Sequence, residues 1–272
     1  MKDLIDNSRV IKGDIVFSIS PKEVKCVEGG YLVIINGISE GIYEKLPNKY
    51  EYLDFVDYSG KIIFPGMTDL HVHASQYGFR GLGMNLELLD WLNTYTFKEE
   101  SKFENSEYAN KAYKIFTEDL LKSMTTRACI FATIHNDATY SLMDMLEKTG
   151  LKTMVGKVNM DRESPEYLCE ESADIAAENT EKFLKHSLTS YHNTKPILTP
   201  RFVPSCSDEL MEKISALRKK YNVPVQSHLS ENKGEIELVK LLNKKSKFKK
   251  SSNRKDKKEK QRTLLLAFAY LF

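Results

Sequence analysis

The feature that most constrains the fold is an alternation of short apolar segments with longer helical patterns, which sets in around Pro65-Gly66. Such alternation is typical of parallel βα units. Five units can be counted, whereas a closed (β/α) barrel needs eight. The apolar segments predict strands over 62–70, 127–134, 152–159, 196–202 and 224–229. The segments between them predict helices near 105–124, 138–149, 166–190, 207–221 and 231–243.

The first part of the chain has a different pattern. Residues 8–63 contain short runs that alternate apolar with polar residues, and Gly29-Gly30 and Asn36-Gly37 supply turn residues between them. We therefore predict an α/β fold, with a small N-terminal β-subdomain over 1–65 and an incomplete TIM-like (β/α) barrel over 66–243.

Charge separates the C-terminal end from the rest of the chain. The net charge is +2, but residues 244–262 hold eleven Lys and Arg against Asp256 and Glu259, a local charge of +9. We expect a Lys-rich, disordered and solvated tail over 244–272. Contact of the basic run with nucleic acid or an anionic membrane is the alternative.

The cysteine spacing and the apolar segments indicate the redox state and the location of the protein. Four cysteines show no CxxC pair, and the N-terminus lacks the apolar core of a signal peptide. The longest apolar run, TLLLAFAYLF, is about half as long as a membrane span requires. We expect a reduced, cytoplasmic protein with no membrane partner and no specific nucleic-acid partner.

Two histidines one residue apart, His71 and His73, follow the first apolar segment of the βα pattern. Side chains two apart in a strand point the same way, and the C-terminal ends of barrel strands face the catalytic mouth. Two imidazoles so placed can hold Zn²⁺, although a pair on a surface strand is the plain alternative. His228 ends the fifth predicted strand, where an ordinary polar strand end is also open.

Several motifs in order carry a family resemblance. PGMTDLHVHA, residues 65–74, resembles the signature of the amidohydrolase superfamily. The segment HASQYGFRGLGMNLELLDWLNTYTFKEESKF that starts at His73 is similar to the guanine deaminase branch, as are TPRFVPSC (199–206) and QSHLSEN (226–232). The resemblance runs from about residue 8 to about 243. It makes the 1–65 subdomain half of the composite β-domain of that superfamily.

The resemblance implies a reaction and a set of site residues. The reaction is hydrolytic deamination of guanine, a small purine, to xanthine and ammonia. Zn²⁺, one per site, lowers the pKa of a bound water to about 7, and a carboxylate can carry the released proton to the departing amine. Another divalent metal such as Fe²⁺ and a family-like homodimer stay open. The implied residues are His71, His73 and His228 as metal ligands, Glu231 as proton shuttle, and Gln76, Arg201 and Phe202 as purine contacts.

The sequence also departs from the family pattern. The family completes its metal site with a histidine after strand six and an aspartate after strand eight, but no histidine follows His228, and Asp256 lies within the basic run. We therefore expect a chain that is truncated or altered after about residue 243, with impaired activity. Two alternatives are a catalytically dead fragment or interaction module, and an amidohydrolase that acts on another heterocycle.

Overall fold

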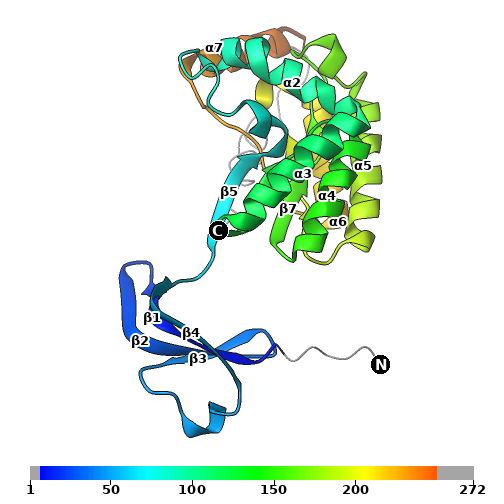
Figure 1. Cartoon of the computed structure of the whole chain (residues 1–272). Helices are drawn as coiled ribbons and strands as arrows, with labels where there is room; N and C mark the ends of the chain where they lie inside the picture. Colours follow the sequence, from blue (N-terminus) through cyan, green and yellow to red (C-terminus); the bar gives the residue numbers. More distant parts are fainter. Residues whose placement is uncertain (1–6, 250–272) are drawn as a thin grey trace. The chain divides into compact units, whose positions relative to one another are not determined.

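The structure, a computed structural model, describes residues 7–249 (Figure 1). The chain divides into two compact units, and the boundary between them falls between Gly66 and Met67. In residues 7–249, no helix combines the length and the apolar character that crossing a membrane would require.

The first unit is a four-stranded sheet with the strand order β3-β2-β1-β4. β1 and β2, and likewise β2 and β3, are antiparallel hairpin neighbours, whereas β4 returns parallel to β1. Asn36 and Gly37 form the β2–β3 turn with φ of 52° and 77°, the left-handed values that a tight hairpin requires. The N-terminal β-structure predicted from the alternation is therefore present. Its strands are β1 (Arg9–Ser20), β2 (Glu23–Ile35), β3 (Ile38–Tyr43) and β4 (Asp54–Ile63).

The second unit is built on a parallel sheet with the order β5-β6-β7-β9. A short parallel pair, β8 with β10, continues the third and fourth barrel strands toward their C-terminal ends. The fifth predicted strand is present as parallel bridges from Leu198 to Val225 and from Phe202 to His228. The strands are β5 (Met67–His73), β6 (Thr125–Phe131), β7 (Lys152–Gly156), β8 (Val158–Asn159), β9 (Thr194–Pro196) and β10 (Thr199–Pro200).

Helices alternate with these strands and cover the outer face of the sheet (Figure 1). Asn105, Ser172 and Ser207 cap three of them by accepting a hydrogen bond from a first-turn N–H. Apolar residues of the helices and of β6 and β7 form one core that includes Phe116, Ile130 and Leu142. The main helices are α3 (Ser106–Lys122), α4 (Asn136–Thr149), α5 (Ala173–Ser190), α6 (Asp208–Tyr221) and α7 (Lys233–Lys249). The α/β prediction, with five βα units of a barrel, is confirmed.

Between β5 and α3 the chain forms a series of short helical turns that the sequence patterns did not predict. One of them is a π-helical turn, a rare form that is frequently found at functional sites. In chain order they are η2 (Ala74–Phe79), α1 (Leu88–Trp91), the π-turn η3 (Leu92–Thr96), α2 (Phe97–Ser101) and η4 (Lys102–Glu104).

Several predicted boundaries differ from the structure, and three of the differences have a clear local cause. The strand predicted over 62–70 is two strands, because Pro65, which has no N–H to donate, lies between the end of β4 and the start of β5. The helix predicted from 166 begins at Ala173, where Ser172 caps it, after a separate turn, η5 (Glu166–Leu168). α7 extends to Lys249, beyond the helix end predicted near 243, since no Pro or Gly interrupts 235–249. The rest of the predicted tail, 250–272, lies outside the described residues.

Candidate active site

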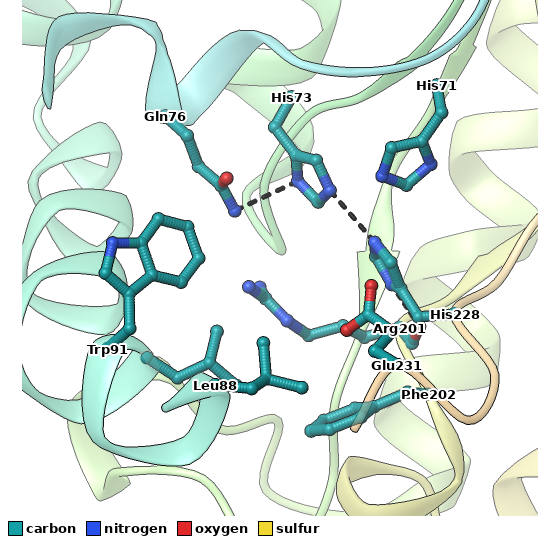
Figure 2. Close-up of a pocket in the computed structure, with 10 residues that line it drawn as sticks. His71, His73, Gln76, Leu88, Trp91, Arg201, Phe202, His228 and Glu231 are labelled. Atoms are coloured by element: carbon teal, nitrogen blue, oxygen red, sulfur yellow. Dashed lines mark hydrogen bonds between the residues drawn. The ribbon is translucent and has the colours of Figure 1, made fainter. Parts of the chain in front are cut away.

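Three histidines meet at the C-terminal ends of the first and fifth barrel strands. His71 and His73 project from β5, and His228 follows the last parallel bridge (Figure 2). One ring nitrogen from each histidine lies within 4.8 Å of the corresponding nitrogens of the other two, and the Nε2 atoms of His73 and His228 are 3.0 Å apart. The rings of His73 and His228 are stacked, with centroids 5.0 Å apart. Residues from opposite ends of the described barrel segment therefore share one site.

The pKa of each of the three imidazoles is lowered, which favours the neutral form. Burial lowers the pKa of His228 to about 4. Burial, with the nearby His228 and Arg201, holds the pKa of His73 well below its ordinary value. Burial also lowers the pKa of His71, although Asp69 opposes the change. Metal ligation requires the neutral imidazole, so the site holds these side chains in the state that binds metal.

The tautomer of His228 follows from its partner. Nδ1 lies 2.7 Å from the main-chain oxygen of Arg201. A carbonyl oxygen can only accept, so Nδ1 carries the hydrogen and the lone pair on Nε2 faces His73. A metal-binding histidine is usually held in this way by its other ring nitrogen.

The histidine cluster fits a catalytic metal site. Three nitrogen ligands with an open fourth position are the arrangement of catalytic zinc sites, and imidazole also suits iron, nickel and copper. Two nitrogens on one tetrahedral zinc are about 3.4 Å apart, so a pair separated by 4.8 Å would have to close by roughly 1.4 Å when the ion binds. Within residues 7–249, His71, His73 and His228 are the only members of this cluster.

A cavity of about 310 Å³ opens beside the histidines. Its size is at the small end of ligand pockets, which favours a small ligand. Leu88, Trp91 and Leu92 come from the helical turns after β5 and form an apolar wall, with Leu88 and Trp91 opposite the histidines in Figure 2. The polar lining consists of the three histidines, Gln76, Arg201 and Glu231, and Phe202 is the remaining lining residue.

Arg201 and Phe202 enter the cavity directly after β10. The Arg201 side chain is only 4% exposed, and its guanidinium lies over the Phe97 ring at 5.3 Å. Its main-chain N–H donates to Asn159 at the end of β8, and the Phe202–His228 bridge fixes the next residue. Strand pairing therefore sets the position of both residues.

Gln76 and Arg201 share a buried partner, Glu100 of α2. Gln76 Nε2 donates to Glu100 Oε1 at 3.0 Å, and Arg201 Nη1 donates to Glu100 Oε2 at 2.5 Å. Gln76 Nε2 is also 3.1 Å from Nδ1 of His73. The sequence patterns did not single out Glu100. Its neighbour Glu99 looks the same in sequence but pairs with Lys102 at 2.6 Å.

Glu231 lies in the turn between His228 and α7. Ser230 has a φ of +57°, and the main-chain N–H groups of Ser230 and Glu231 donate to the buried carboxylate of Glu235 at 3.1 and 2.6 Å. The Glu231 side chain lines the cavity beside His228 (Figure 2). Burial, together with Glu235, raises the pKa of Glu231. A carboxyl whose pKa moves toward neutral pH is suited to proton transfer.

The structure thus brings all seven residues singled out in the sequence to one cavity, and adds Glu100 behind two of them. They come from three separate parts of the chain: the end of β5 with the turn that follows it, the end of β10, and the segment after the last parallel bridge.

Comparison with known proteins agrees with this architecture. The sequence pattern of the Amidohydrolase family matches residues 62–253. Guanine deaminase of Homo sapiens is 43% identical over 185 residues, which cover 67% of this chain and 40% of the human protein. Guanine deaminase of Dictyostelium discoideum is 36% identical over 256 residues, covering 86% of this chain and 56% of the relative.

A solved structure shows the same fold. The crystal structure of guanine deaminase from C. acetobutylicum with bound guanine superposes with a TM-score of 0.85 at 46% identity, covering 88% of this chain and 57% of that one. The chain spans about half the length of the relatives that it matches.

Proposed function

The chain belongs to the amidohydrolase family, and from this premise we propose that its site binds guanine and serves the hydrolytic deamination of guanine to xanthine and ammonia. The family is metal-dependent. One observation carries the proposal: three imidazoles with lowered pKa values, a carboxyl with a raised pKa, and an arginine and a glutamine converge on one small cavity at the C-terminal ends of parallel strands. The similarity to guanine deaminases supports guanine as the base.

The histidines would hold the metal. His71, His73 and His228 supply three nitrogen ligands, and we assign the ion as one Zn²⁺ per site, with Fe²⁺ also suited to imidazole. When bound, such an ion lowers the pKa of a coordinated water to about 7. The main-chain oxygen of Arg201 holds His228 in the tautomer that ligation needs.

Glu231 would move the proton. Its side chain lines the cavity beside His228, and burial raises its pKa, so it can accept a proton from water and release it again near neutral pH. Delivered to the amino nitrogen as the bond to the ring carbon breaks, this proton leaves with the amine as ammonia. The oxygen of water stays on the ring carbon and becomes the second carbonyl of xanthine, and the other hydrogen of water ends on the ring nitrogen that was doubly bonded to this carbon.

Gln76, Arg201 and Phe202 would hold the base. Arg201 offers guanidinium N–H groups to a ring carbonyl or ring nitrogen, and Gln76 offers an amide on the same side of the cavity, since both side chains hydrogen-bond to Glu100. Phe202, which is buried against the bridge to His228, gives an aromatic face for a planar ring.

The test is ammonia and xanthine release from guanine by the full chain with added Zn²⁺. We expect turnover at least tenfold below the typical median of about 10 per second. The reason is that the described residues supply three metal ligands and five strands of a barrel. Glu231→Gln should abolish this turnover. Glu237→Gln is the matched control, since Glu237 lies on α7 and pairs with Lys240 outside the cavity. Equal ammonia release by wild type and Glu231→Gln would refute the proposed role.

The same experiment separates the two alternatives. A catalytically dead fragment or interaction module releases no ammonia from any base while its metal-loaded form still binds ligand. An amidohydrolase for another heterocycle releases product faster from a pterin or a triazine than from guanine.

A further inference from the structure

We propose that Glu100 is a positioning residue for the base: its carboxylate joins the side chains of Gln76 and Arg201 into one recognition unit, so that each of these two purine contacts depends on the other. This inference rests on the proposed function, because it concerns the same cavity. It adds a residue that acts on the base without touching it.

The first observation is that the two oxygens of Glu100 bind two different side chains. Oε2 accepts from Nη1 of Arg201 at 2.5 Å, and Oε1 accepts from Nε2 of Gln76 at 3.0 Å. The Glu100 side chain is 2% exposed and does not line the cavity, whereas Gln76 and Arg201 both do. Glu100 therefore acts on a ligand through these two residues, from behind them.

The second observation is how α2 holds Arg201. Phe97 and Glu100 are the two buried residues of this short helix. The guanidinium lies over the Phe97 ring at 5.3 Å, and its Nη1 contacts Glu100, so α2 holds both a face and an edge of the same planar group. Phe97 packs in one apolar cluster with Leu92, five residues earlier, across the π-turn η3. The turn thus anchors the helix that carries Glu100.

The third observation is the direction of the two hydrogen bonds. A carboxylate can only accept, so the amide atom of Gln76 that faces Glu100 is the nitrogen. Arg201 spends one of its five N–H groups on Glu100 and keeps others to donate. A glutamine at position 100 would have one accepting oxygen and one donating nitrogen. It could therefore accept from only one of the two partners and would turn an N–H toward the other.

These contacts predict that the two purine contacts are coupled. If Gln76 is removed, Glu100 loses one of its two side-chain partners and holds Arg201 less firmly. The losses in base affinity caused by changing Gln76 and Arg201 then overlap, so the double variant loses less than the product of the two single losses. We call the ratio of that product to the observed double loss the coupling factor. Residues that share one hydrogen-bond network commonly give a factor of about threefold or more.

The experiment measures base affinity by the fluorescence of Trp91, the only tryptophan of the chain, which lines the cavity. The probe is hypoxanthine, which has the ring system and the carbonyl of guanine but lacks the amino group, so it binds without being turned over. All titrations use the full chain with the same saturating Zn²⁺. Gln76→Ala, Arg201→Lys and the double variant are measured in three backgrounds: wild type, Glu100→Gln and Glu99→Gln.

In the wild-type background, Gln76→Ala and Arg201→Lys should each weaken hypoxanthine by about fivefold or more, with a coupling factor of about threefold or more. Glu100→Gln should weaken hypoxanthine by about tenfold and bring the coupling factor close to one. Glu99→Gln changes the adjacent carboxylate, which pairs with Lys102, and should keep both the affinity and the coupling factor of wild type. A merely structural role for Glu100 would lower the thermal midpoint and leave the coupling factor of the folded protein as it is.

Three outcomes would overturn the inference: wild type binds no hypoxanthine, the coupling factor is close to one in wild type, or Glu100→Gln keeps the wild-type factor. If Glu100→Gln does not fold by circular dichroism, Glu100→Asp takes its place. Its shorter side chain keeps the charge but cannot reach both partners, so the coupling factor should again fall toward one, and a wild-type factor would refute the proposal. If neither variant folds, the coupling factor in wild type decides.

The inference and the proposed reaction can fail separately. Coupled binding of hypoxanthine without ammonia release from guanine would sink the proposed reaction alone. Ammonia release from guanine with a coupling factor close to one would sink this inference alone.

Discussion

The main-chain oxygen of Arg201 accepts two hydrogen bonds from His228, one from the ring Nδ1 at 2.7 Å and one from the main-chain N–H at 2.9 Å. Arg201, whose guanidinium lines the cavity, therefore also fixes the ring orientation of His228, one of the three clustered histidines. Ser227 donates its hydroxyl to the same oxygen at 3.3 Å. Pairing between the fourth and fifth barrel strands thus links the position of the Arg201 side chain to that of His228.

Metal binding should depend on the three clustered histidines. His73→Ala should reduce Zn²⁺ affinity by about a hundredfold or more, since changing even a residue behind a ligand costs about 10–100-fold. His186→Ala is the control, because His186 is exposed on α5. Metal content after dialysis measures the effect. With three protein ligands in the described cluster, wild type should retain less than one zinc per chain against a chelator. Tight one-to-one zinc would reveal a further ligand.

Gly156 should not tolerate a side chain. A Cβ at this position, at the end of β7, would lie 1.7 Å from Oγ1 of Thr199 and 2.9 Å from Nε2 of Gln226. Gly156→Ala should therefore destabilise the fold by about 1–3 kcal/mol or more, and it should weaken ligand binding because Thr199 precedes Arg201. Gly78→Ala is the control, since its nearest neighbour is 3.7 Å away. Equal thermal midpoints for the two variants would contradict the packing found here.

A buried ion pair joins Lys157, between β7 and β8, to Glu170, in the segment before α5. Lys157 and Glu170 are in contact, and their side chains are 0% and 5% exposed. Burial lowers the pKa of Lys157, although Glu170 opposes the change. Lys157→Met should cost about 3–5 kcal/mol, because it leaves a buried carboxylate unpaired. Adding Glu170→Gln should recover part of this loss, with a coupling energy above about 0.5 kcal/mol in urea unfolding. The exposed pair Lys182–Glu178 should couple by no more than about 0.5 kcal/mol.

Glu147 should make stability depend on acidic pH. Burial alone would raise the pKa of Glu147, but the main-chain N–H groups of His192, Thr194 and Asn193 donate to the carboxylate and lower the pKa overall. The unfolded chain therefore binds the proton first as pH falls. The contribution of Glu147 is complete above the unfolded pKa, near 4.5, and is lost as pH drops through the folded value. Glu147→Gln should destabilise the protein at pH 7 by about 1 kcal/mol.

The control for this pH effect is Glu178→Gln, which changes an exposed carboxylate on α5. Urea unfolding between pH 7 and pH 3 should show the difference between wild type and Glu147→Gln shrinking below about pH 4.5, with no such change for the control. A constant difference across this range would mean that the carboxylate charge does not hold the loop before β9.

The sequence alone determined the local features of this protein. The periodicity of 127–134 and 207–221 predicted β6 and α6 closely, because side-chain alternation and helical spacing are set by neighbours along the chain. His71 and His73 were predicted to point the same way for the same reason. The motifs at 65–74, 199–206 and 226–232 indicated the family. The element boundaries were predicted less accurately. The apolar run around Pro65 was predicted as one strand, although its two ends belong to different units of the chain.

Only the tertiary structure decided which charged residues share an environment. Glu99 and Glu100 are adjacent and chemically identical, but the turns that lead into α2 place Glu100 under Arg201, 101 residues away in sequence, and leave Glu99 to pair with Lys102. His73 and His228 are 155 residues apart and meet because parallel pairing carries the strand ends to one edge. Burial, the pKa of each group and the charge of the pocket follow from such distant contacts. A chain's local pattern cannot encode them, because the atoms that desolvate and neutralise each group come from other strands and helices.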